Sequence, residues 1–203
     1  VTMPTQDMII GLFHLTSEVP DGKGAGRAFG TPAEARMAFD AHQIELGSRV
    51  KLRVTDVVPP AGFVLPEGVV PGPDGIVSSL IIETTLGRAL FNETLPLDYP
   101  FVEAPVDKKQ LSTIVNDLAE RYTKVQVAAS LDALKEAGFH WATRSGSTVA
   151  ISDVVTPPTK IKILEEYETR AAKVQKLYDR GAMTDNERRE DLIEIWNEAT
   201  NKV

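Results

Sequence analysis

The last third of the chain, residues 157–203, constrains the fold more than any other feature. Pro157 and Pro158 open a run in which apolar or small residues recur in steps of three and four, and a second such run ends the chain. Gly181 stops the first run, and Thr184 begins the second with a capping box. Two helices joined by so short a turn fold back as an antiparallel hairpin. The predicted seam positions are Leu164, Tyr167, Ala171, Val174, Tyr178, Leu192, Trp196, Ala199 and Val203.

This predicted hairpin is only two helices thick, so it has much surface and few deep contacts. We therefore expect an arm that projects from a body. Its second helix carries a cluster of carboxylates that includes Glu190, Asp191 and Glu194. Each single carboxylate fits a solvated helix face, whereas the arm as a whole favours a docking edge for a basic partner.

The body, residues 1–156, mixes strands with helices, which predicts an α+β fold class. Apolar and basic residues alternate over 48–55, which is typical of a half-buried strand, and a second strand is expected at 77–83. Glycine-rich residues 17–30 and proline-rich residues 56–75 predict two mobile loops, the first of which we expect to bury little.

Four helices are expected in the body. The first covers 4–15 and has Thr5 as its cap, and the second starts at Thr31-Pro32 and runs to about His42. The third starts after Asp107, and the fourth covers 130–138 and stops at its glycine.

Composition and charge argue against several classes of function. The formal net charge is −7 and no basic run occurs, so we expect the chain alone not to hold nucleic acid by charge. The absence of cysteine excludes disulfides and cysteine-ligated zinc, and it fits a cytoplasmic location. No membrane-spanning run or secretory signal is visible.

No catalytic or metal-binding constellation is visible. The three histidines, His14, His42 and His140, fall on separate predicted elements, and no phosphate-binding loop or nucleophile motif occurs. The chain begins with Val1 rather than methionine. We expect a fragment of a longer polypeptide, with a processed terminus as the alternative.

Four stretches, taken in order, resemble the β′ subunit of bacterial DNA-directed RNA polymerase. They are Met3–Leu12, Glu83–Arg88, Gly138–Gly146 and the arm sequence that ends with Leu192–Trp196. The resemblance implies the pore and funnel region, which forms the wall and rim of the secondary channel. Nucleotides are expected to enter there, backtracked RNA to leave, and cleavage factors of the Gre type to dock.

The same resemblance implies what lies elsewhere in the full subunit. The aspartate motif Asn-Ala-Asp-Phe-Asp-Gly-Asp, which binds the catalytic metal in this family, does not occur in the sequence. We therefore expect the chain to act as part of a nucleotidyltransferase and to be inactive alone, with Mg²⁺ and Zn²⁺ bound elsewhere. The implied partners are the β, α, ω and sigma subunits, with DNA and RNA only in the full assembly.

The resemblance also assigns candidate residues. Gln6 matches a glutamine at the active-centre end of the channel, and a simple place in the first helical turn is an equal alternative. Arg88 and Arg144 lie in the tightest motifs and are candidates for the nucleotide or RNA path, although bracing is favoured for Arg144.

Glu190, Asp191 and Glu194 are the candidates for factor docking at the rim. The alternative for the whole chain is a free-standing acidic interaction protein that binds partner helices through its hairpin.

Overall fold

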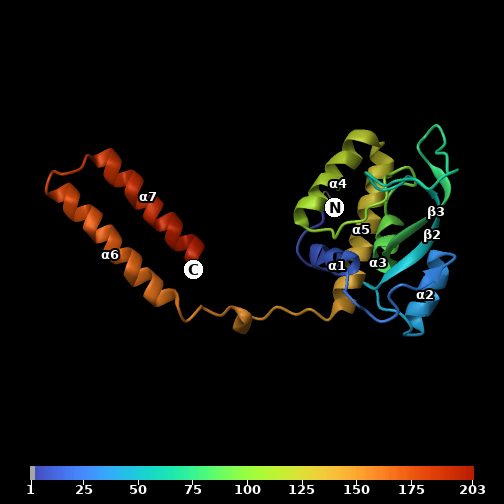
Figure 1. Ribbon diagram of the computed structural model, residues 1–203, viewed down its shortest axis with the longest axis horizontal. Coiled ribbons are helices and arrows are strands. Elements are labelled where there is room, and N and C mark those ends of the chain that lie inside the picture. Colours follow the sequence, from blue (N-terminus) through green and yellow to red (C-terminus); the bar gives the residue numbers. More distant parts are fainter. Residues whose placement is uncertain (1–2) are drawn as a thin grey trace. The chain divides into compact units, whose positions relative to one another are not determined.

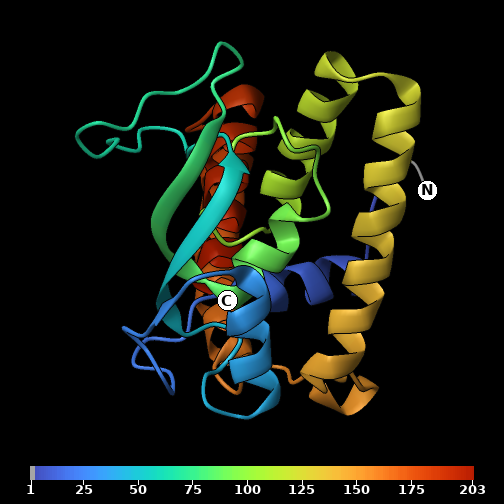
Figure 2. The same cartoon turned by 90° about the vertical axis from the view of Figure 1, so that its right-hand side faces the viewer.

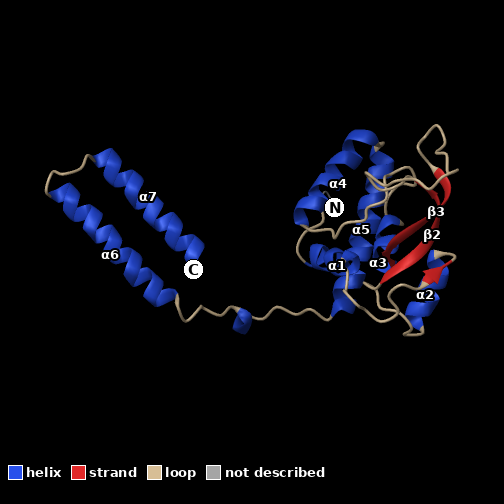
Figure 3. Cartoon of the chain, viewed as in Figure 1, coloured by secondary structure: helices blue, strands red, loops and turns tan. Residues whose placement is uncertain are grey.

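The computed structural model describes residues 3–203, and the chain divides into two compact units between Ser147 and Thr148 (Figure 1). Val1 and Thr2, with which the predicted body begins, lie outside the described residues. The predicted boundary at 156/157 falls in the segment between α5 and α6. Helices and a small sheet share the first unit, and this confirms the α+β class (Figure 3).

The first unit contains α1 (Asp7–Thr16), β1 (Ala28–Phe29), α2 (Pro32–Asp40), β2 (Arg49–Val57), β3 (Val77–Thr85), α3 (Leu86–Asn92), α4 (Lys108–Arg121) and α5 (Lys124–Ser145). The second contains a short 3₁₀ turn, η1 (Ile151–Asp153), and the helices α6 (Lys160–Asp179) and α7 (Asp185–Lys202).

The sheet has the strand order β1-β2-β3, with β1 parallel and β3 antiparallel to β2. Burial alternates along β2, which confirms the half-buried strand. Its apolar residues face the core, and its basic residues face solvent. The inner face of the sheet packs against the helices of the first unit, and together they form one hydrophobic core (Figure 2). Its fully buried residues include Leu12, Leu52, Leu86 and Phe91.

Helix α5 differs from the prediction at both ends. It begins after Thr123, whose side chain forms a capping box with Gln126, and it continues to Gly146 with φ of 66°. The predicted start at Ser130 and stop at Gly138 are therefore wrong. Gly138 lies inside the helix, at the point where α1 crosses it. A Cβ atom on Gly138 would lie 2.9 Å from the Cα of Met8. The glycine is needed for close packing rather than for helix termination.

Of the three caps predicted for other helices of the first unit, two are present and one is absent. Thr31 and Asp107 accept the amide hydrogen bonds expected of caps, from Glu34 and Gln110. The carboxylate of Glu34 reaches back to the amide of Gly30 at 2.7 Å. Thr5 does not cap α1, because the residue before this helix is Gln6, which makes no side-chain cap bond.

The glycine-rich segment 17–30 contains a short strand that its composition does not predict. Phe29 is 7% exposed and belongs to the core, and Ala28 and Phe29 form β1 against Lys51 and Leu52. Apart from Phe29 and Gly22 no residue of the segment is buried and most are exposed, so the expectation that it buries little is confirmed. The mobility of 17–30 and of 56–75 stays a prediction.

In the second unit, α6 and α7 form the predicted antiparallel pair. The capping box of Thr184 and Glu187 is present, and Gly181 adopts φ of 72° in the turn. On α7 one buried seam position differs by one residue from the predicted one: it is Ile195 and not Trp196. Ile195 is buried beside Tyr167, whereas Trp196 is 39% exposed.

Candidate functional site

Arg88 is the centre of the most connected polar cluster in the first unit. The side chain of Thr85 accepts the Arg88 amide at 3.1 Å and so fixes the first turn of α3. The guanidinium then reaches the end of α1, where Nε donates to the Thr16 carbonyl at 3.1 Å. Its Nη1 donates to Glu18 at 3.2 Å and to Glu103 at 2.9 Å. Three separate parts of the chain therefore meet on one side chain.

The charges of this cluster are nearly balanced. Glu18 also pairs with Arg49 at 2.9 Å, so two guanidinium groups face two carboxylates. Burial raises the pKa of Glu103, while the charge of Arg88 opposes this rise. Oε2 of Glu103 and Oγ1 of Thr84 are buried and make no hydrogen bond to any residue of 3–203. The cluster therefore binds elements together at some cost in desolvation.

Arg88 is 4% exposed, and its donors are directed at oxygens of this chain. In this arrangement the residue braces α1, α3 and the segment around Glu103. A contact with nucleotide or RNA, as the resemblance implies for Arg88, would need the guanidinium to leave these partners.

Gln6 lies at the other end of α1. It precedes the helix with φ of 51° and ψ of −121°, a backbone conformation that residues other than glycine rarely adopt. Its side chain is exposed, while its carbonyl accepts the amides of Ile9 and Ile10. The ten residues of α1, Asp7–Thr16, span about 15 Å at about 1.5 Å per residue. Gln6 and Arg88 are thus not brought together.

Arg144 lies in the last turn of α5 and is exposed. Its side chain makes no hydrogen bond or ion pair with the residues that the structure describes. A cation at this position is favoured by the negative end of the helix dipole. The Arg144 side chain is therefore available to a partner outside the described residues. No contact with these residues supports a bracing role for Arg144 within the chain.

The three rim candidates lie on α7, but only two of them share a surface feature. Asp191 and Glu194 line a shallow hollow of about 320 Å³ together with Arg170 and Lys173 of α6. Glu190 is exposed and does not line this hollow.

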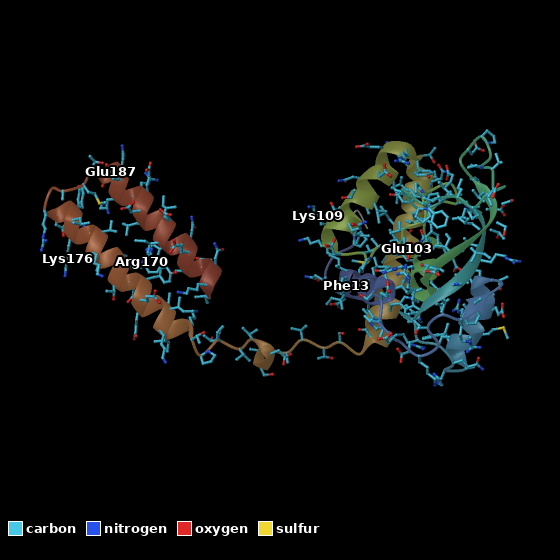
Figure 4. The ribbon with its side chains drawn as sticks, in the orientation of Figure 1. Phe13, Glu103, Lys109, Arg170, Lys176 and Glu187 are labelled. Atoms are coloured by element: carbon cyan, nitrogen blue, oxygen red, sulfur yellow. The ribbon has the colours of Figure 1, made fainter. Side chains whose placement is uncertain are left out.

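The hollow has a positive edge and a negative edge. Arg170 and Lys173 provide the first, and Asp191 and Glu194 provide the second, with Val174 and Ile195 between them. Arg170 is held in place by Glu198 at 2.7 Å and lies over the ring of Tyr167 (Figure 4). Such a surface can receive a partner that presents both charges around an apolar residue.

Several residues that position these groups were missed by sequence reasoning. Glu18 and Glu103 lie 70 and 15 residues from Arg88 in sequence, so no local pattern joins them to it. Gly11 and Gly138 make the crossing of α1 and α5 possible, and a glycine inside each helical pattern was the available signal.

Within 3–203 no group of three or more His, Asp or Glu side chains could hold a metal ion. None of the helices in that range is long and apolar enough to cross a membrane.

Comparisons with known proteins give the family. Residues 1–154 match the family model described as RNA polymerase Rpb1, domain 3. The DNA-directed RNA polymerase subunit beta' of Kineococcus radiotolerans is 65% identical over 203 residues, and that of Beutenbergia cavernae is 64% identical. The subunit of a Nocardioides strain is 61% identical over 204 residues.

In each of these three alignments the match covers 100% of this chain and 15% of the relative. The chain thus spans about 15% of the length of the relatives that it matches. The ordered resemblance seen in the sequence is confirmed along the full chain, and the chain belongs to the family of the bacterial RNA polymerase β′ subunit.

Proposed function

We propose that the chain serves DNA-directed RNA polymerase as the wall and rim of its secondary channel. In this role the first unit lines a path for entering nucleotides and for backtracked RNA. The α6/α7 hairpin offers a docking surface to factors of the Gre type. The family match over residues 1–154 and the identity along the full chain carry the proposal.

Nucleotidyl transfer in this proposal belongs to the whole enzyme, in the cytoplasm. The chain would contribute shape and charge, and the β, α, ω and sigma subunits would complete the assembly around DNA and RNA. The Mg²⁺ and Zn²⁺ that the resemblance implies would be bound by other parts of the subunit. A free-standing interaction protein accounts for the hairpin but not for the match along the body.

The two units would divide the work. In the first unit, the Arg88 cluster ties the end of α1 to α3 and to Glu103 and so keeps the wall rigid. Gln6 and Arg144 are exposed and would face the path. In the second unit, the hollow between Arg170 and Asp191 presents charges of both signs to a factor.

The rim assignment is tested in the assembled polymerase of the source organism. Asp191→Lys and Glu194→Lys are introduced together into the full-length subunit. We expect a Gre-type factor to bind about tenfold more weakly, because two charges of the docking surface are reversed. Factor-stimulated RNA cleavage in backtracked complexes should fall, whereas basal RNA synthesis should be unchanged.

Glu120→Lys is the matched control, because Glu120 is an exposed carboxylate on α4, in the other unit. It should leave factor binding unaltered. A collapse of basal synthesis in the Asp191/Glu194 variant, or an equal effect of the control, would contradict the rim assignment.

A further inference from the structure

Strand β3 is the outer strand of the sheet and has an open edge (Figure 2). It pairs with β2 from Ser79 to Thr85 and again at Val77. In an antiparallel edge strand, about half of the backbone N–H and C=O groups point away from the neighbour. Within residues 3–203, the backbone of 78–84 makes no hydrogen bond on that outer side.

Two of the devices that usually protect such an edge, proline and lysine, are missing from β3, and Glu83 is its one charged residue. The register with β2 keeps one offset from Arg49↔Thr85 to Thr55↔Ser79, so no inserted residue interrupts this stretch. Asp56, with φ of 52°, forms no pair with Ser78, and pairing resumes at Val57↔Val77. A long edge with so little protection is suited to receive another strand.

The two faces of β3 specify what such a strand must carry. Leu80 and Ile82 face the core and are each 2% exposed. Ser79, Ile81 and Glu83 face solvent, and Ile81 is 55% exposed. An added strand would therefore place apolar side chains beside the core positions and would cover Ile81 with a further apolar residue.

Charge at Glu83 adds a second requirement. Lys51 of β2 pairs with Glu83 at 3.7 Å, and the Glu83 side chain remains 60% exposed. A basic residue directly opposite Glu83 on an added strand would have its Cβ atom about 5 Å from that of Glu83 across the ladder. A lysine or arginine opposite Glu83 would continue the cross-strand pairing that Lys51 begins.

We propose that β3 receives an extended segment of the polymerase assembly that lies outside these 203 residues, as a fourth strand. The segment alternates, with apolar residues toward the core and a polar, an apolar and a basic residue beside Ser79, Ile81 and Glu83. The source of the segment rests on the proposed function, because the chain spans about 15% of its relatives' length. The shape and charge of the edge stand independently of it.

Hydrogen exchange of the β3 amides tests the source of the strand. It is measured in the 203-residue chain alone and in the purified full-length polymerase, with amides of α4 as the internal reference. The outward amides of 78–84 should exchange about tenfold more slowly, or slower still, in the polymerase. Equal exchange in the two samples would overturn the proposal.

A synthetic peptide tests the edge itself. The probe alternates valine with serine, isoleucine and lysine, and its control carries glutamate in place of lysine. The lysine peptide should shift the NMR signals of β3 amides and bind the Glu83→Lys chain about threefold more weakly, with the glutamate peptide showing the reverse preference. Shifts away from β3, or affinities that ignore the charge at position 83, would overturn the proposal.

Two other outcomes are distinguishable. If β3 amides of the chain alone become protected as concentration rises, a second copy is the occupant, and the proposed partner is wrong. If the native polypeptide that contains this chain does not purify with RNA polymerase, the proposed function is wrong. The peptide experiment then decides by itself whether the edge of β3 receives a strand.

Discussion

Gly11 of α1 and Gly138 of α5 lie at the point where the two helices cross, with backbone against backbone. A methyl group on Gly11 would overlap the Gly138 carbonyl and would lie 2.6 Å from the Ala142 amide nitrogen. Both neighbours are main-chain atoms of a 22-residue helix, so neither can move aside without shifting α5. This contact fixes the orientation of α1, and therefore the positions of Gln6 at its start and Thr16 at its end.

Gly11→Ala should therefore destabilise the first unit by about 3 kcal/mol, at the high end of the range for overpacking. The two tryptophans make the measurement specific, because Trp141 lies in the first unit and Trp196 in the second. In a Trp196→Phe background, urea unfolding followed by Trp141 fluorescence reports on the first unit alone. Gly72→Ala is the control, because its methyl group would meet Ile76 at an ordinary 3.4 Å. An equal effect of both substitutions would contradict the crossing.

Much of the fold could be predicted because its signals are local. The alternation in β2 and the caps at Thr31, Asp107 and Thr184 need only neighbouring residues, and the structure contains all of them. Gly138 could not be read correctly, because a glycine that ends a helix and one that admits a neighbouring helix look alike in sequence. Tertiary packing decides between them.

The candidate site was predicted less well for the same reason. Arg88 is recognisable in a family motif, but its partners Glu18 and Glu103 come from distant segments. In α7, Ile195 and Trp196 both fit a helical period, and only the position of α6 selects Ile195 for the seam. Sequence spacing gives a face to within about one residue, since each step turns the helix by about 100°.

Arg88→Met should lower the free energy of unfolding of the first unit by about 3 kcal/mol, because Glu103 would remain partly buried without its partner. Adding Glu103→Gln should recover part of this loss, since the unpaired charge is then removed. Both variants are measured by Trp141 fluorescence in the Trp196→Phe background. A pair of substitutions whose effects simply add would show that the two side chains do not interact.

Glu103 should also make the stability of the first unit depend on pH. Burial raises its pKa above the ordinary value of 4.5, so the folded state binds the proton more tightly than the unfolded state. The resulting contribution is fully present below about pH 4.5 and is lost as the pH rises through the raised, folded-state pKa. The advantage of the wild type over Glu103→Gln should therefore shrink as the pH rises from about 4.5 through the folded-state pKa. An advantage that grows over this interval would mean that attraction to Arg88 outweighs burial.

In the α6/α7 hairpin, substitutions of a buried and of an exposed residue of α7 should differ in their effect on stability. Ile195 is 6% exposed between Tyr167 and Ala199, whereas Trp196 next to it is 39% exposed. Ile195→Ala should cost about 3 kcal/mol through the cavity that it leaves, and Trp196→Ala should cost about 1 kcal/mol. Hydrogen exchange of the α6 amides around Tyr167 measures both, because these amides open when the two helices separate. Faster exchange in the Trp196 variant than in the Ile195 variant would move the seam of α7 by one residue, to the register that periodicity alone predicts.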